Sequence, residues 1–518
     1  MNAFLQRHLQ SVTGMISGWD RLRFRGTLRM LANVTGMDHF LSYTGHLLKD
    51  FGQYALHLSR QVRNASLAVA ESIGRPVEHL RNPCINKEVL AKAIAQRDGI
   101  KEGLIGVLTA VEPCWSYDIQ SNRKEGLLEL IRSYRKCQHL YHYQIHPLFG
   151  LMHVRLQTWF PFNIHVCVNG REWLAGQMDE AGINYLRQDN CFTWIQDLAG
   201  AAKLADRQVR FNWARALDEL VPSVNPILKQ ITGGYRIGYY WSLDQSEWAS
   251  DVMFKRRQDL EQLYPSLLRH GMESFSSREV MRFLGRSVER GITPRFKGQV
   301  ISDIAAKPEK YEGVRIKHRV NLNSVKMYNK AGSVLRVETT LNNMRDLQSP
   351  RRINGKVVYK RMRKGVADMP RRAQISEASN RRYLEAMAAV STPLPLKILT
   401  QKLSRPTKWK GKRVRGLNML GQEDAGLLEA VGRGEFLISG FRNRDLQSLL
   451  FVGGSDDPIQ KRRRCGQITR KLRMLRAHGL IHKVPHTHRY MVNERGRQVI
   501  AALHAARQAD VQKLIKAA

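Results

Sequence analysis

The sequence predicts a multidomain α+β protein, and its length, hydrophobic content and apolar periodicity support this prediction. The 518 residues suffice for about two to four domains, and a hydrophobic fraction of 43% suffices for sizeable cores. Apolar residues recur at helical spacing in some stretches and alternate with polar residues in others. We expect a mainly helical N-terminal region (1–110), a mixed α/β core with antiparallel hairpins (111–345), a basic helix and linker (346–420) and a C-terminal module of helices and a hairpin (421–518).

The formal net charge is +39, and most of it lies in the last third of the chain. Residues 351–518 contain 37 Lys and Arg against 12 Asp and Glu, which leaves a net charge of +25 for this part. Such a surface attracts phosphate backbones and releases counterions on binding. We therefore expect a nucleic acid as the partner, with DNA first and RNA as the alternative.

Composition also bears on membranes and on the redox compartment. No apolar run approaches the roughly 20 residues that a membrane span requires, so no membrane partner is expected. The six cysteines are scattered without a CxxC pair, which fits a reducing cytoplasm and gives no zinc-knuckle signature. The sequence does not indicate an oligomeric state.

Residues 19–29, WDRLRFRGTLR, alternate apolar side chains with arginines. This alternation is typical of a strand with one arginine-lined face. Arg21, Arg23 and Arg25 could form a comb for phosphates, with Asp20 on a metal. The alternative, which we favour, is a solvated basic edge strand that ends near Gly26.

Residues 151–160, LMHVRLQTWF, predict a strand with His153 and Arg155 on one face. The following NIHVCVNG predicts a second strand that carries His165, with Asn169-Gly170 as a turn. Pairing of these strands would form a polar patch, with His153 and His165 as catalytic candidates and Arg155 as a phosphate contact. The alternative is a set of histidines satisfied by hydrogen bonds in an aromatic core.

A divalent metal is expected only in general terms. Imidazoles on neighbouring elements suit Zn or Mn, but no histidine spacing here is diagnostic. Single-strand nicking enzymes of the HUH class need two histidines one residue apart on a strand, and Arg155 stands where the second would be. We predict that residues 180–290 are mainly helical, so Glu247, Asp251 and Asp259 are interpreted as helix-surface acids. Asp244 and Glu247 could instead belong to a metal site, which is the less favoured interpretation. Mg or Mn therefore remains a candidate cofactor without assigned ligands.

Residues 313–343 predict a strand from Ile316 to Val320 and a hairpin from Val325–Lys330 to Val334–Thr340. Lys326 and Tyr328 share one face of this hairpin. Cations beside a phenol lower its pKa and help it attack a phosphodiester.

This hairpin supplies the other candidate site residues. Tyr328, Lys326 and Glu338 are catalytic candidates, and Arg336 is a candidate nucleic-acid contact. The text VKMYNK…VLRVE is similar to the YDK…LRxE hairpin of phage and plasmid rolling-circle replication initiators, over a short stretch. The alternative is a structural hairpin with exposed Lys and Arg.

Residues 346–420 predict one helix from Ile375 to Val390, entered through Arg371 and Arg372. A proline- and lysine-rich linker follows it. The C-terminal module then begins with a helix from Glu423 to Val431.

The C-terminal module reads as helices, a hairpin and a last helix. Asn443 can cap a helix from Arg444 to about Phe451. Asp457 and Pro458 open a second helix, about 459–478, which Gly479 ends.

The second of these helices has two kinds of face. Ile468, Leu472 and Leu475 form an apolar stripe, while basic and amide side chains fall largely elsewhere. Leu480–Val484 and Tyr490–Val492 then predict a hairpin with its tip at residues 485–488. This pattern indicates a winged helix-turn-helix, in which the long helix enters a groove.

The expected nucleic-acid contacts are polar residues of this helix and hairpin. We assign base edges to Gln467, Arg470 and Arg473. The phosphate and wing contacts are Lys461, Arg462, Arg463, Arg464, His488 and Arg489.

The stretches LRAHGLI and THRYMVNERGRQV resemble MarR-like winged-helix regulators. Asn493 stands where that group more often has Thr, and both residues cap helices. The whole chain is similar to an uncharacterised, often multicopy bacterial protein group, and multiple copies imply a mobile element.

We therefore expect a nucleic-acid-binding protein of a mobile genetic element, with duplex DNA as its target. The central region has two interpretations. It is a transposase-like or replication-initiator enzyme that cleaves a strand, or it is non-catalytic, as in a transcriptional regulator or a structured-RNA scaffold.

Overall fold

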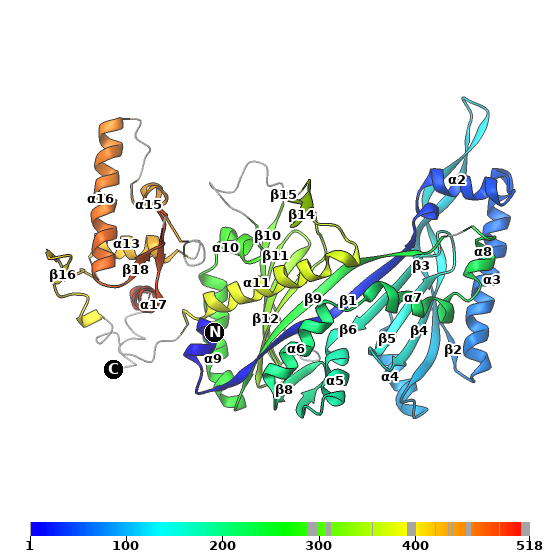
Figure 1. The fold of residues 1–518 in the computed structure, drawn as a ribbon, viewed down its shortest axis with the longest axis horizontal. Helices are drawn as coiled ribbons and strands as arrows, with labels where there is room; N and C mark the ends of the chain where they lie inside the picture. The colour runs from blue at the N-terminus through cyan, green and yellow to red at the C-terminus, as the bar shows by residue number, and fades with distance from the viewer. Residues whose placement is uncertain are drawn as a thin grey trace. The chain divides into compact units, whose positions relative to one another are not determined.

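The computed structural model confirms the α+β class, with a large mixed sheet and many helices (Figure 1). It describes residues 2–235, 237–286, 298–306, 312–345, 347–354, 356–390, 400–419, 421–433, 436, 440–451, 457–485 and 487–508. The chain forms two compact units that interleave in sequence. Unit 1 is Met1–Gly14, Val252–Val337 and Ala378–Ala518, and unit 2 is Met15–Asp251 and Glu338–Glu377. These units do not follow the expected boundaries at residues 110, 345 and 420.

Unit 2 is built on a sheet whose strands follow the order β13-β9-β1-β6-β5-β4-β3-β2. The pairs β1–β6, β6–β5, β5–β4 and β4–β3 are antiparallel, and β3 pairs with β2 in parallel. The unit boundaries cut β1, β9 and β13, so these strands contribute residues to both units. The strands are β1 (Val12–Leu28), β2 (Val77–Leu80), β3 (Gly103–Asn122), β4 (Leu127–His146), β5 (Gly150–Gln157), β6 (Ile164–Asn169), β9 (Tyr239–Phe254) and β13 (Val334–Leu341).

Helices cover the apolar face of this sheet because alternate strand residues are apolar. Leu22, Phe24 and Val166 are buried on that face. There the Oγ of Ser66 on α3 lies 2.8 Å from Nε2 of His142 on β4. The remaining elements of unit 2 are α2 (Val34–Tyr43), α3 (Phe51–Ser72), α4 (Lys87–Arg97), α5 (Gly170–Glu180), α6 (Leu198–Val209), α7 (Trp213–Val224), α8 (Leu228–Ile231), β7 (Tyr185–Gln188), β8 (Cys191–Ile195), β14 (Gln348–Ile353), β15 (Lys356–Arg361) and the 3-10 turns η1 (Met30–Ala32), η2 (Leu48–Asp50) and η3 (Val366–Asp368).

Two expectations for unit 2 are wrong. The arginine-bearing strand is not an edge strand, because β1 lies between β9 and β6. It also continues past Gly26 to Leu28, and a Cβ at Gly26 would lie 2.8 Å from the Trp241 ring. Asn169-Gly170 is not a hairpin turn: the Asn169 side chain accepts a hydrogen bond from the Arg171 N–H at 2.9 Å and caps α5.

Unit 1 contains the predicted hairpin, which is confirmed as β12 and β13. Its neighbour β11 pairs antiparallel with both β10 and β12. His318 on β11 lies 3.1 Å from the Tyr383 hydroxyl through Nε2 and 2.7 Å from Ser302 Oγ through Nδ1. The elements of this part are α1 (Ala3–Arg7), α9 (Arg257–Glu273), α10 (Ser277–Phe283), β10 (Val300–Ala306), β11 (Glu312–Val320) and β12 (Asn323–Lys330).

The helix of the basic connector begins earlier in the chain than expected. α11 (Met369–Met387) begins six residues before Ile375, so Arg371 and Arg372 lie inside it. The guanidinium of Arg372 is buried and donates to the Leu243 carbonyl, which removes one arginine of the expected basic arm from solvent.

The last part of unit 1 has the helix and hairpin order of a winged helix (Figure 1). A buried apolar core joins its helices and its hairpin. No described helix is long and apolar enough to cross a membrane. The elements are β16 (Thr407–Trp409), β17 (Lys412–Val414), α13 (Gln422–Gly432), α15 (Asn443–Leu450), α16 (Pro458–Ala477), β18 (Ile481–Lys483), β19 (Tyr490–Val492) and α17 (Glu494–Gln508).

The buried ion pair of unit 2 gives a stability prediction. Arg171 Nη2 and Asp251 Oδ2 are 3.0 Å apart, and both side chains are fully buried. We expect Asp251→Ala to lower the free energy of unfolding by about 3–5 kcal/mol, because it leaves an uncompensated buried guanidinium. Urea unfolding followed by circular dichroism measures the change.

Two further variants test the cause of this loss. The double variant Arg171→Leu with Asp251→Leu removes both charges and should be the more stable of the two Asp251 variants. Glu219→Ala breaks the exposed pair with Arg215 and should cost only about 0.2–1 kcal/mol. A single Asp251→Ala loss as small as that of Glu219→Ala would contradict the assignment.

Candidate nucleic-acid interface and carboxylate cluster

The ends of α16 are set by its flanking residues. Asp457 Oδ1 accepts a hydrogen bond from the Ile459 N–H at 2.9 Å, and Pro458 occupies the first turn, where its missing N–H costs nothing. Gly479 has φ +68°, the left-handed conformation that commonly ends a helix. The helix predicted over about 459–478 is therefore confirmed.

The apolar stripe of α16 is buried as expected. Ile468, Leu472 and Leu475 are each at most 1% exposed. They pack in one core with Leu446 of α15 and other apolar residues of α13, β18 and α17. Burying such side chains contributes about 1.5–3 kcal/mol each, so this face of α16 is fixed to its supporting helices.

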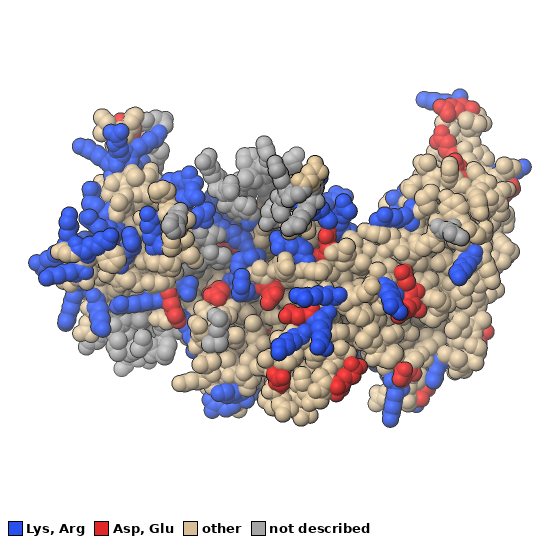
Figure 2. Space-filling view, viewed as in Figure 1, with Lys and Arg blue, Asp and Glu red and all other residues tan. Residues whose placement is uncertain are grey.

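The opposite side of α16 presents cations to solvent. Lys461, Arg462 and Arg463 are exposed near its start, and Arg470 and Arg473 are exposed further along. Among the described residues, neither Arg470 nor Arg473 has an ion-pair partner. Gln467 is exposed as well. Figure 2 shows Lys and Arg side chains crowding the surface of the C-terminal helices.

Asn443 has a different role from the expected one. It is the first residue of α15 rather than its cap, and its Nδ2 donates to the Cys465 carbonyl at 2.9 Å and to Thr469 Oγ1 at 3.0 Å. The Asp445 carboxylate instead accepts from the Arg442 N–H at 2.7 Å. These bonds fix α15 against α16, as a helix-turn-helix requires.

The wing is a short antiparallel hairpin. Ile481 pairs with Val492, and Tyr490 forms a further antiparallel bridge to Phe441. His488 is exposed and Arg489 is half-buried, while the expected tip residue His486 lies outside the described residues. Arg464, at the start of α16, is also half-buried, with its guanidinium 5.2 Å from the Phe451 ring centroid.

The predicted polar patch exists on the second face of the unit 2 sheet. Arg155 on β5 stands directly opposite His165 on β6, and His165 stands opposite Arg25 on β1. Two residues further along these strands, His153 on β5 stands opposite Cys167 on β6. Opposed residues of paired strands point to the same face. The patch therefore extends onto β1, which the sequence did not predict.

The two histidines of the patch are uncharged at neutral pH. Burial, helped by the charge of Arg23, lowers the pKa of His153 to about 4. Burial and the charges of Arg155 and Arg25 lower the pKa of His165 well below its usual value. Neither side chain is therefore a charged proton donor near neutral pH, and the lowered pKa also makes each a weak base.

Arg155 is held by a carboxylate at the edge of this face. Its Nη1 lies 3.4 Å from Glu112, whose carboxylate also accepts from the Tyr141 hydroxyl at 2.7 and 2.8 Å and pairs with Lys87 Nζ at 3.2 Å. Burial alone would raise the pKa of Glu112, but the bonds from Tyr141 and Lys87 lower it. Glu112 therefore holds the Arg155 guanidinium in position and compensates part of its positive charge.

Three carboxylates of neighbouring strands converge in unit 2. Asp20 on β1, Glu247 on β9 and Glu338 on β13 each place an oxygen within 4.8 Å of the others. Asp20 is 4% exposed and Glu338 1%. Oxygen ligands of this kind suit Mg²⁺ or Mn²⁺.

Neighbouring groups hold this carboxylate cluster in place. Asn190 Nδ2 donates to Asp20 Oδ1 at 2.7 Å. Burial alone would lower the pKa of Arg21, but the negative charges of Glu247 and Asp20 outweigh it and raise the pKa. The sequence interpretation of Glu247 as a surface acid on a helix is wrong, because it lies on the strand β9.

The other candidate residues of the hairpin are not surface groups. Tyr328 is 7% exposed, with Lys326 Nζ 5.4 Å from its ring centroid. Arg336 is fully buried, so it does not present its guanidinium to a nucleic acid. A buried phenol is a poor nucleophile for a large substrate, and Glu338 belongs to the carboxylate cluster instead.

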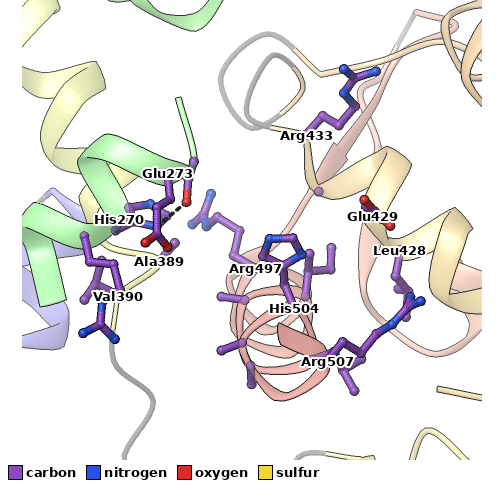
Figure 3. A pocket seen from close by; sticks show the side chains of 18 of the residues that line it. His270, Glu273, Ala389, Val390, Leu428, Glu429, Arg433, Arg497, His504 and Arg507 are labelled. Atoms are coloured by element: carbon purple, nitrogen blue, oxygen red, sulfur yellow. Dashed lines mark hydrogen bonds between the residues drawn. The ribbon is translucent and has the colours of Figure 1, made fainter. Parts of the chain in front are cut away.

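Unit 1 also has a cavity of about 740 Å³ (Figure 3). His270 and Glu273 of α9 line one side, and Arg497 and His504 of α17 line the other. His270 Nδ1 lies 3.0 Å from Ser274 Oγ, so this imidazole already forms a hydrogen bond at the end of its own helix. The lining groups do not converge on one point, and we assign no site to this cavity.

Comparison of the chain with protein-family models, with curated proteins and with solved structures gives no significant match. Two features of the chain itself bear on function, namely the cationic side of α16 and the cluster of Asp20, Glu247 and Glu338.

Proposed function

We propose that the chain is a nucleic-acid-binding protein of a mobile genetic element, with duplex DNA as its target. The observation that supports this most directly is α16, whose apolar stripe is buried while its arginines face solvent. A recognition helix needs this division, because one face must anchor it while the other reaches the groove. The mobile-element context comes from the resemblance of the whole chain to a multicopy bacterial group.

The dimensions of α16 fit a major groove. Its 20 residues span roughly 30 Å, and the groove of B-DNA is about 12 Å wide, enough for one helix. Gln467, Arg470 and Arg473 are three residues apart and can face base edges together. In this proposal, phosphates would be contacted by Lys461–Arg464 at the start of the helix and by His488 and Arg489 of the wing.

Two double variants separate base reading from phosphate binding. Arg470→Ala with Arg473→Ala should weaken binding to a duplex selected from a random library by at least about tenfold, since one base contact contributes about 1–3 kcal/mol. Arg462→Ala with Arg463→Ala should weaken all duplexes alike and make the slope of log Kobs against log salt shallower by roughly 2. Fluorescence anisotropy at several salt concentrations measures both effects.

A control removes the same charge elsewhere. Arg60→Ala with Arg207→Ala takes two exposed arginines from unit 2 and should leave duplex binding within about twofold of wild type. Circular dichroism should show all variants folded, because each removed side chain is exposed. Unchanged affinity in the Arg470 and Arg473 variant would contradict the assignment, and loss of structured-RNA binding alone would favour the RNA alternative.

A second candidate function is metal-dependent strand cleavage in unit 2. It is supported by the convergence of the Asp20, Glu247 and Glu338 oxygens, and by the electrostatic effect of Glu247 and Asp20 on Arg21. Alternate residues on one strand lie about 6.6–6.8 Å apart, so Arg21, Arg23 and Arg25 can contact successive groups of an extended chain. Carboxylates that hold a hard metal ion are common in nucleases.

Each group has a definite part in this second candidate function. Asp20, Glu247 and Glu338 would hold Mg²⁺ or Mn²⁺, which when bound supplies Lewis-acid stabilisation and an activated water. Arg21 and Arg23 are exposed and would bind and orient the strand. Arg155, paired with Glu112, would neutralise a further phosphate at the edge of the same face.

The carboxylates give a mutational prediction. Asp20→Asn and Glu338→Gln should each lower the cleavage rate of labelled single- or double-stranded DNA by at least about 100-fold, because a metal supplies several kcal/mol of charge stabilisation. Gel assays with Mg²⁺ or Mn²⁺ measure the rate, and duplex binding by α16 should stay unchanged.

Three comparisons complete this experiment. Glu219→Gln, at an exposed carboxylate, should cleave like wild type. A covalent DNA adduct that Tyr328→Phe abolishes would move the chemistry to that tyrosine. Wild-type protein that cleaves none of these substrates with either metal would leave the non-catalytic regulator or scaffold as the function of unit 2.

A further inference from the structure

Two cysteines and a histidine meet in the middle of the β3–β4 hairpin. Glu112 pairs with Cys137, and Cys114 pairs with Arg135, so the two cysteines are diagonal neighbours on one face of the sheet. Their sulfurs are 2.9 Å apart. The Cys137 sulfur is 3.9 Å from His139 Nδ1, and all three ligand atoms lie within 4.8 Å of one another.

These three side chains are buried and incompletely satisfied. Cys114 is 6% exposed, Cys137 8% and His139 0%. The Nδ1 atom of His139 lies 3.2 Å from the Cys137 carbonyl oxygen, whereas its Nε2 atom has no hydrogen-bond partner among the described residues. A buried imidazole normally has both nitrogens satisfied, so an unpartnered one indicates a ligand or a cost in stability.

The charge of this ligand set suits a divalent cation. Metal ions bind cysteine as the thiolate and histidine as the neutral imidazole, and two thiolates neutralise one divalent cation.

We propose that Cys114, Cys137 and His139 form a zinc site. Two sulfurs and one imidazole nitrogen are a ligand set that zinc prefers to magnesium or manganese. The sulfurs need to separate by roughly 1 Å to accept tetrahedral bonds of about 2.3 Å. Three protein ligands leave the fourth position of the tetrahedron to a small ligand such as water.

The site is distinct from the carboxylate cluster in both place and chemistry. It lies on β3 and β4, whereas the carboxylates lie on β1, β9 and β13. Bound zinc would cross-link the two 20-residue strands of the hairpin at their middle. The proposal does not depend on nucleic-acid binding or on strand cleavage.

Cobalt and zinc test the proposal directly. Full-length protein, purified with a chelator and kept reduced, should bind one equivalent of Co²⁺ with the thiolate-to-cobalt absorption of a sulfur-ligated site. Zn²⁺ should displace the cobalt and abolish that absorption. Cys114→Ser and Cys137→Ser should each lose the absorption, and His139→Ala should weaken zinc affinity at least about tenfold.

Control variants separate loss of ligands from loss of folding. Cys191→Ser removes another buried cysteine of unit 2 and should keep the full cobalt absorption. Circular dichroism and urea unfolding report whether each variant is folded. Wild-type protein that is folded and reduced yet binds no zinc would overturn the proposal, as would Cys114→Ser with an unchanged cobalt spectrum. Isolation of the native protein with a Cys114–Cys137 disulfide that reductant does not open would overturn it too.

Discussion

The alternation of side chains along β1 is the constraint on which the architecture of unit 2 depends. Leu22 and Phe24 must be buried, which turns Arg21, Arg23 and Arg25 to the other face. A shift of one residue in register would exchange the two sets, so the pairing of β1 with β6 fixes where the positive charge lies. The register continues from β6 into β5, where Arg155 pairs with His165. This pairing places both side chains on the arginine face and forms the polar patch.

In α16, apolar and basic residues are likewise separated onto two faces, here at the spacing of a helix. Ile468, Leu472 and Leu475 bind the helix to its support, so Arg470 and Arg473 cannot turn inward without exposing that stripe. The exposed guanidiniums need no partner within the chain because water solvates them, and phosphates can replace this water on binding. Both units therefore hold positive charge in place through apolar packing.

Local patterns could be predicted from the sequence because they depend on neighbouring residues. The alternation in β5, the hairpin of β12 and β13, and α16 with its Gly479 end all follow from residues close together in the chain. The errors arose where tertiary structure decides the outcome. Asn169-Gly170 is a turn signal by composition, yet the fold uses Asn169 as a helix cap.

The carboxylate cluster could not be found by local reasoning. Asp20, Glu247 and Glu338 are separated by hundreds of residues, and only the strand order β13-β9-β1 brings them together. Glu247 lies in a stretch whose apolar spacing also suits a helix, so it was interpreted as a surface acid. The cysteine pair was missed for the same reason, since Cys114 and Cys137 become neighbours only through the register of β3 with β4.

The two proposed metal sites differ in the hardness of their ligands. Carboxylate oxygens such as those of Asp20, Glu247 and Glu338 suit hard ions such as Mg²⁺ or Mn²⁺. Thiolates such as those proposed at Cys114 and Cys137 suit zinc. Because ligand softness discriminates between the metals, the two proposed sites would not compete for the same ion. Under both proposals a zinc ion would link the strands of the β3–β4 hairpin, and a separate, harder ion would lie among the carboxylates of β1, β9 and β13.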